Sequence, residues 1–325
     1  MQIPAKQIAG LPSGANFKDV ILVGASTYST AQAAYNAAVA VLGAGPDTSV
    51  TMLLGYKSNG TDFGSITVGA AWPTGIKMSG VGTHSSKINA ITVSGYSANI
   101  SATDMTIASI VGHNSAVTIL GEDISVGSIN LNDAGAGAGS LNISGSGVQV
   151  TGTIDTTSAA GIGGNVVVGN LLQTGAISTN GNIAGGNITI GESCITGALT
   201  FGTAPGSPGV ITIGKKSSTG TLTGGSAGSF ILQIADCRVN AISGNLATTS
   251  KLHRVEILSG SIVVAAANIL FVDCRFYNSS SACISSSSPY SVILLGCMAA
   301  TDVASSITVA EGSLLISSSL SAPAS

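Results

Sequence analysis

Charged and aromatic side chains are scarce: of the 325 residues, only 8% are charged and 4% are aromatic. The 11 Lys and Arg against 14 Asp and Glu leave a formal charge of −3, so we expect no basic surface for nucleic acid. The low charge also excludes a disordered, solvated chain. Mean hydropathy is +0.51. Even so, polar residues or glycine interrupt every apolar run before about 18 residues, so we expect no membrane insertion.

The N-terminus lacks the charged start and apolar core of a secretory signal. The cysteines are odd in number and form no CxxC pair, which excludes a disulfide framework and a zinc site. They are Cys194, Cys237, Cys274, Cys283 and Cys297. We predict buried thiols in a protein that folds in a reducing cytosol, and no metal or other cofactor.

What the chain has in abundance is a short repeat, an apolar–polar–apolar triplet followed closely by glycine. Its first residues are Ile66, Ile91, Val117, Leu141, Val166, Ile188 and Ile211. A second series runs out of phase with the first, through Ile76, Ile100, Ile124, Val148, Leu172, Ile195 and Leu222. A third passes through Ile107, Leu131, Ile154, Ile177 and Phe201. Three short strands per ~24 residues predict an all-β fold, a single-stranded right-handed parallel β-helix of about twelve coils and three sheets.

The ends of the chain differ from this repeat. Thr30–Gly43 reads as a helix that Ser29 or Thr30 caps, so residues 29–45 are predicted to cover the open end of the first coil. Residues 46–318 then form the β-helix, and residues 319–325 a polar tail. Residues 1–28 are expected to lie outside the solenoid as an attachment segment. Its candidate contact residues are Ile3, Pro4, Ile8 and Leu11.

Four segments carry a resemblance: Asp19–Val23, Tyr28–Ala38, Val50–Lys57 and Asn268–Asn278. The first three resemble the entry, with its helix and its strand ending in Gly-x-Tyr, and the fourth resembles a common coil of the pectate-lyase-like β-helix superfamily. Here Tyr56 follows Gly55 directly, a departure of one residue. Ile3–Pro12 is similar to short segments that precede the shafts of bacteriophage fibres and spikes. The resemblance implies a fold and a trimeric virion protein, but it specifies no chemistry.

Members of that superfamily that cleave polysaccharides use clustered acidic side chains, and much of this chain contains no such cluster. Residues 134–191 contain one charged side chain, Asp155. The C-terminal coils are richer, because Asp-Cys-Arg occurs twice with further charges between. If cysteine faces inward, alternation places these charges together on the outside: Asp236, Arg238, Arg254, Glu256, Asp273 and Arg275. The patch reads either as a saccharide-binding or hydrolytic site, or as an ion-pair ladder or subunit contact. We favour the second interpretation, since arginine keeps a neighbouring Asp ionised.

Beside this patch, the sequence predicts an outward apolar stripe of Leu232, Ile234, Ile269 and Phe271. A monomer rarely exposes such a stripe, so we expect it to be an oligomer interface in a homotrimer.

These observations favour a bacteriophage virion structural protein without enzymatic activity, a trimeric head or tail fibre or spike that contributes to host-surface attachment. It would assemble in the host cytoplasm and bind other virion proteins through its N-terminal segment. A host-surface polysaccharide is a further candidate partner. The main alternative is a polysaccharide-degrading tailspike or lyase on the same fold, and a bacterial surface adhesin is a minor one.

Overall fold

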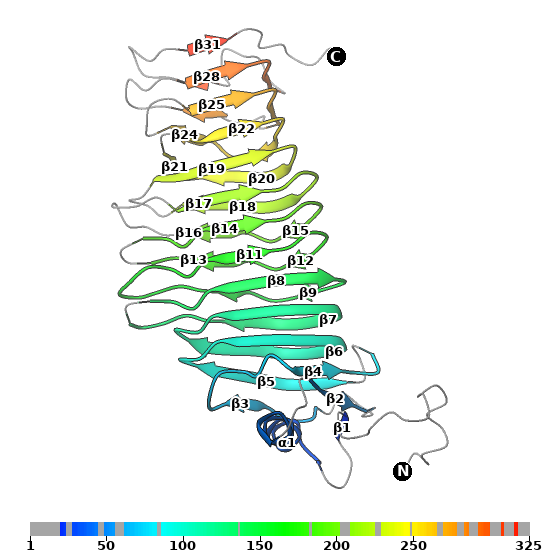
Figure 1. Cartoon of the computed structure of the whole chain (residues 1–325). Helices are drawn as coiled ribbons and strands as arrows, with labels where there is room; N and C mark the ends of the chain where they lie inside the picture. The colour runs from blue at the N-terminus through cyan, green and yellow to red at the C-terminus, as the bar shows by residue number, and fades with distance from the viewer. Residues whose placement is uncertain are drawn as a thin grey trace.

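A computed structural model describes the chain over fifteen segments. They are residues 20–23, 28–44, 49–55, 62–82, 86–135, 137–181, 184–201, 209–224, 229–247, 249–264, 269–277, 283–285, 292–299, 307–308 and 315–317. The strands pair in parallel and stack coil upon coil along one axis, with the helix at the N-terminal end (Figure 1). The expected all-β parallel β-helix with an N-terminal helix is confirmed.

The pairing resolves each coil into three strand positions, which we call sheets 1, 2 and 3. Sheet 1 contains β1 (Val20–Val23), β2 (Val50–Leu54), β4 (Ile76–Ser79), the start of β6 (Ala98–His113) and of β7 (Val117–Asn130), β8 (Leu141–Ser146), β11 (Val166–Val168), β14 (Ile188–Ile190), β17 (Val210–Ile213), most of β19 (Ser229–Ala235), β22 (Lys251–His253), β25 (Ile269–Val272), β28 (Val292–Leu295) and β31 (Leu315–Ser317).

Sheet 2 contains the start of β5 (Lys87–Ser94), the middle of β6 and β7, β9 (Gln149–Val150), β12 (Gln173–Thr174), β15 (Ile195–Thr196), the start of β18 (Ser218–Gly224) and of β20 (Arg238–Ser243), β23 (Glu256–Ser259), β26 (Arg275–Phe276) and β29 (Met298–Ala299). Sheet 3 contains β3 (Ile66–Val68), the ends of β5, β6 and β7, β10 (Ile154–Asp155), β13 (Ile177–Thr179), β16 (Leu199–Phe201) and the ends of β18 and β20. In the C-terminal coils a separate run of parallel pairs joins the start of β19 to β21 (Asn245–Leu246), β24 (Ile262–Val264), β27 (Ile284–Ser285) and β30 (Ile307–Thr308).

Inward side chains stack directly on their counterparts in the next coil. One such column in sheet 1 runs through Ile100, Ile119, Ile143, Val168, Ile190, Ile213 and Ile234. Every member of this column is at most 3% exposed. Full burial of an aliphatic side chain contributes about 1.5–3 kcal/mol, so repeated columns offset the cost of ordering a chain rich in glycine.

The corner between sheets 1 and 2 is built the same way in ten coils. One residue, two positions before the paired residue of sheet 2, adopts a left-handed conformation with φ between 49° and 64°. The corner residues are Asp104, Asp123, Gly147, Leu171, Ser193, Lys216, Asp236, Arg254, Asp273 and Gly296. Several donate their N–H to the coil above, as Leu171 does to the Glu192 carbonyl at 2.9 Å, so the hydrogen-bond ladder continues around the bend.

The predicted period is correct, but the predicted series join strands of different sheets. Ile91 pairs with Ile110 in sheet 3, not with Val117, which belongs to sheet 1. The cause is coil length: Ile91 and Ile110 are 19 residues apart, whereas Ile119 and Ile143 in sheet 1 are 24 apart. After two short coils, a step of 24 residues along the chain leads from a strand of one sheet to a strand of another.

A second correction concerns Ile195, because alternation within the second repeat series predicts that its members face the core. It is 56% exposed, and the preceding Cys194 occupies the inward position at 0% exposure. All five cysteines are buried thiols, as predicted.

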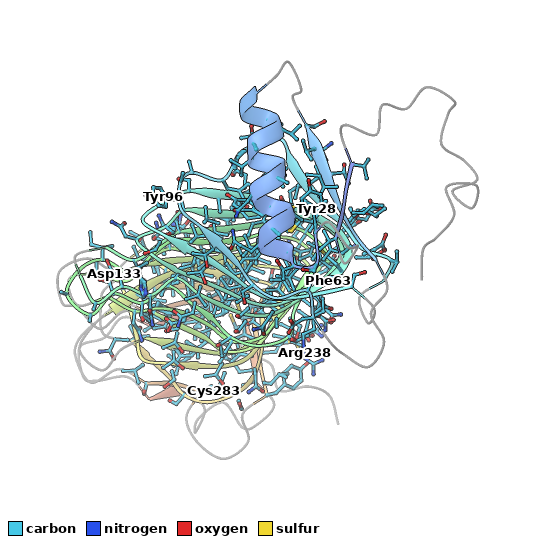
Figure 2. All side chains as sticks on the ribbon, turned by 90° about the horizontal axis from the view of Figure 1, so that it is seen from below. Tyr28, Phe63, Tyr96, Asp133, Arg238 and Cys283 are labelled. Atoms are coloured by element: carbon cyan, nitrogen blue, oxygen red, sulfur yellow. The ribbon has the colours of Figure 1, made fainter. Side chains whose placement is uncertain are left out.

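Helix α1 (Ala31–Ala44) covers the N-terminal end of the stack, as predicted. Figure 2 looks along the coils from this end and shows α1 lying across them. Thr30 caps it, because its Oγ1 accepts a hydrogen bond from the Ala33 N–H at 3.2 Å. The Gln32 side chain bonds the backbone of β3, accepting from the Thr67 N–H at 2.6 Å and donating to its carbonyl at 3.4 Å. A side-chain amide thus replaces a neighbouring strand at a sheet edge.

The predicted N-terminal boundary is wrong in one respect. Strand β1 pairs in parallel with β2, so the solenoid's sheet 1 already includes Val20–Val23 and does not begin after residue 45. Residues 1–19 and the predicted tail 319–325 lie outside the described residues.

Leu171 generates a prediction about stability. It is the one bulky apolar residue in the corner column, with φ of 61° and 70% exposure. A left-handed conformation costs an ordinary residue about 1–2 kcal/mol, and asparagine tolerates it. We therefore expect Leu171→Asn to raise the free energy of unfolding by about 0.5–1 kcal/mol in urea denaturation.

The matched control is Leu120→Asn. Leu120 is also exposed, at 54%, but lies within strand β7 with no positive φ. This change should leave stability unchanged or reduce it. Equal effects of the two substitutions would contradict the explanation based on the corner.

Candidate functional site

The candidate site lies where sheets 1 and 2 meet in the C-terminal coils. Three successive corner residues there, Asp236, Arg254 and Asp273, carry alternating charges. Two positions further along the chain, the outward residues of sheet 2 alternate in the opposite sense. These are Arg238, Glu256 and Arg275, neighbours in register. Coil stacking therefore produces a checkerboard of charge, which we call the charge ladder.

The tightest contact in the charge ladder joins neighbouring coils. The Arg254 guanidinium donates two hydrogen bonds to the Asp236 carboxylate, from Nε to Oδ1 and from Nη2 to Oδ2 at 2.7 Å. This fork geometry is the strong form of an arginine–carboxylate pair. Arg254 Nη1 also lies 2.8 Å from His253 Nε2. The hydrogen bond from Arg254 holds the pKa of Asp236 below its usual value.

The next pairs are looser and more exposed to solvent. Arg275 Nη1 lies 3.6 Å from Glu256 Oε1, and His253 Nε2 lies 3.9 Å from Asp273 Oδ2. A shallow cavity of about 330 Å³ opens between these side chains. It is lined by Arg254, Val255, Glu256, Asp273 and Arg275.

The structure places the side chains of Cys237 and Cys274 inward and those of the six charged residues outward. The pairing was not foreseen. Asp236 is held by Arg254 of the next coil and not by Arg238, two residues away on its own coil. His253 was also missed, although its position next to Arg254 was the available signal.

Chemically, this arrangement suits ion pairing better than acid–base catalysis. A general acid must hold its proton near neutral pH, and an arginine-bonded carboxylate is kept ionised. Among the described residues, no group of three or more His, Cys, Asp or Glu side chains is placed to hold a metal ion. No described helix is long and apolar enough to cross a membrane.

The predicted apolar stripe is wrong in its register. Leu232, Ile234, Ile269 and Phe271 are at most 3% exposed, so they belong to the core and form no outer surface. The error comes from carrying strict alternation across the corner. Phe271 and Cys274 both face inward although they are three residues apart. The left-handed conformation of Asp273 interrupts the alternation of inward and outward side chains between them.

The residues that do face outward on these strands are also apolar. Leu270 and Val272 of β25 alternate with the buried positions, and they pair in register with Ile293 and Leu295 of β28. All four are partly exposed. We call them the outer apolar block. It lies beside the charge ladder, because Val272 is followed directly by Asp273.

The candidate attachment residues Ile3, Pro4, Ile8 and Leu11 lie outside the described residues.

Comparison with protein-family models, curated proteins and solved structures returns no match for this chain.

The charge ladder predicts an effect on the titration of Asp236. Replacing the partner, Arg254→Ala, removes the hydrogen bonds that stabilise the carboxylate, so the pKa of Asp236 should rise toward its usual value. Carboxyl-carbon NMR titration measures this directly. Arg238→Ala is the control and should leave that titration close to wild type.

The same shift gives a direction for stability. Because the folded-state pKa of Asp236 lies below the unfolded value, its pairing stabilises the fold above the unfolded pKa. This contribution is lost as pH falls through the folded-state pKa. If the pKa of Asp236 is the same in the wild type and in the Arg254→Ala variant, the role given to Arg254 is wrong.

Proposed function

We propose that this protein is a non-enzymatic structural component of a bacteriophage particle, a trimeric fibre or spike that contributes to attachment at the host surface. The observation that carries the proposal is the outer apolar block, Leu270, Val272, Ile293 and Leu295, with the charge ladder along its edge. Contiguous aliphatic side chains on an outer sheet face favour burial against a partner.

A second copy of the chain is the occupant that suits this surface best. Within each of these coils the corner residue and the outward sheet 2 residue carry opposite charges, as Asp236 and Arg238 do. Three-fold rotation keeps equal coils of the three copies at the same height, so the corner column of one copy can face opposite charges in the sheet 2 column of its neighbour. The resemblance to phage fibres and spikes supports three copies.

No acid–base pair is evident among the residues that the structure describes, and this supports an assembly role over catalysis. Charged residues of the ladder form ion pairs with one another. In the middle of the rod, residues 134–191, Asp155 is the one charged residue. In this account residues 1–19 join the particle and the distal coils meet the host.

The alternative, a polysaccharide-degrading tailspike, has one observation in its favour: the cavity lined by Glu256 and Asp273 places two carboxylates beside two arginines. A reducing-sugar assay on host-surface polysaccharide separates the two functions. Activity that disappears in Asp236→Ala or Asp273→Ala would establish the alternative.

Two substitutions in β25, one at an outward and one at an inward position, test the predicted self-association. Leu270→Asp places a charge in the contact, so the dissociation constant should rise at least about tenfold while the fold persists. Phe271→Asp buries that charge in the core and should prevent folding. Light scattering gives the mass of the assembly and circular dichroism the fold.

Wild-type protein that stays monomeric at micromolar concentration would contradict the interface. So would a Leu270→Asp variant that is as large as wild type.

Attachment to the particle gives the second test. Deleting residues 1–18 leaves β1 and α1 in place, so the rod should fold but fail to join assembled particles. Normal incorporation of the shortened chain would contradict the role given to this segment. The control is the Leu120→Asn variant, which should be incorporated as wild type is.

A further inference from the structure

Four of the five cysteines share one column, formed by the inward residue that follows each left-handed corner. In successive coils the column runs through Val148, Leu172, Cys194, Ser217, Cys237, Val255, Cys274 and Cys297. Ser217 separates Cys194 from Cys237, and Val255 separates Cys237 from Cys274. Cys274 and Cys297 are therefore direct neighbours in the stack.

The register of sheet 2 brings these two thiols together. Arg275 and Met298, the residues that follow them, are paired, and the Met298 N–H donates to the Cys274 carbonyl at 2.8 Å. Neighbouring strands lie about 4.8 Å apart, which is within the range of Cα separations that a disulfide spans. Both side chains point inward and are at most 1% exposed.

The two thiols also occupy equivalent surroundings. Cys274 Sγ lies 3.4 Å from the Leu252 and Val272 carbonyls, and Cys297 Sγ lies 3.5 and 3.6 Å from those of Phe271 and Leu295. Each sulfur thus contacts one carbonyl of its own coil and one of the coil below. The two thiols are also near enough for each to shift the pKa of the other.

The interaction between the two thiols makes them unequal. It lowers the pKa of the Cys297 thiol and, together with burial, raises that of Cys274. Cys237, which has Ser217 and Val255 as its column neighbours, shows the contrast: burial raises the pKa of its thiol to about 12. The Cys297 thiolate is accordingly the nucleophile of the pair, since thiolates and not thiols react with oxidants.

We propose that Cys274 and Cys297 are an oxidation site, at which a peroxide converts the two stacked thiols of the folded protein into a disulfide between neighbouring coils. The bond covalently links the coil that contains Cys274 to the next coil, which contains Cys297, near the C-terminal end of the stack. A chain made in a reducing cytosol keeps the dithiol, and a chain released into an oxidising medium acquires the disulfide.

The step balances with hydrogen peroxide as oxidant. The Cys297 thiolate attacks one peroxide oxygen, the O–O bond breaks, and the departing hydroxide leaves as water with the proton released by Cys297. The resulting sulfenic acid is attacked at sulfur by Cys274, the S–O bond breaks, and a second water leaves with the Cys274 proton. Two thiols and one peroxide give one disulfide and two waters.

Peptide mapping tests the proposal on the full-length folded protein. The protein is treated with hydrogen peroxide, denatured, alkylated, digested without reductant and analysed by mass spectrometry. We expect one cross-linked peptide pair joining Cys274 to Cys297, about 2 Da lighter than the sum of its reduced peptides. Cys194, Cys237 and Cys283 should stay reduced during the peroxide treatment and be recovered as alkylated cysteines. The oxidised protein should also melt at a higher temperature, an effect that dithiothreitol reverses.

Two variants keep the result interpretable. Cys237→Ser changes a thiol of the same column and should still form the Cys274–Cys297 bond. Cys274→Ser removes the partner, so Cys297 should accumulate as sulfenic or sulfinic acid instead. A folded wild-type protein that keeps five alkylated cysteines after treatment would overturn the proposal. Random cross-links among all five cysteines, or Cys297 overoxidised while Cys274 stays reduced, would do so as well.

Discussion

The structure depends on the vertical stacking of like positions in successive coils. An inward isoleucine rests on an isoleucine or valine of the next coil, while parallel backbone hydrogen bonds hold the two coils in register. Each coil by itself buries too little apolar surface to be stable, so the stability of the rod comes from contacts between neighbouring coils. This explains how a chain with 44 glycines and 4% aromatic residues builds a continuous core.

Stacking also organises whatever chemistry the outer surface has. A residue type repeated in consecutive coils becomes a ladder, as Gln149 and Gln173 show by bonding each other at 3.4 Å. In the C-terminal coils the same rule gives alternating charges on the outside and two adjacent thiols on the inside. The charge ladder, the outer apolar block and the cysteine pair thus all follow from the register of β20 to β29.

Sequence reasoning recovered the features that are local or strictly periodic. The strand repeat predicted the fold, the alanine-rich segment after Thr30 predicted α1, and Asp-Cys-Arg predicted buried thiols beneath outward charges. It could not assign strands to sheets, because coil length varies and a 19-residue coil looks like a change of phase. It also misplaced Phe271, because nothing in the sequence marks Asp273 as a left-handed corner that interrupts alternation.

The central claim is that the outer face of β25 and β28 is where copies of this chain meet. A cryo-electron microscopy structure of the purified full-length protein tests it most directly. The account predicts three chains in contact across Leu270, Val272, Ile293 and Leu295, with Phe271 inside each coil and charge ladders facing each other at the rim. A monomeric rod with these four side chains in solvent, or an assembly joined through a different face, would contradict it.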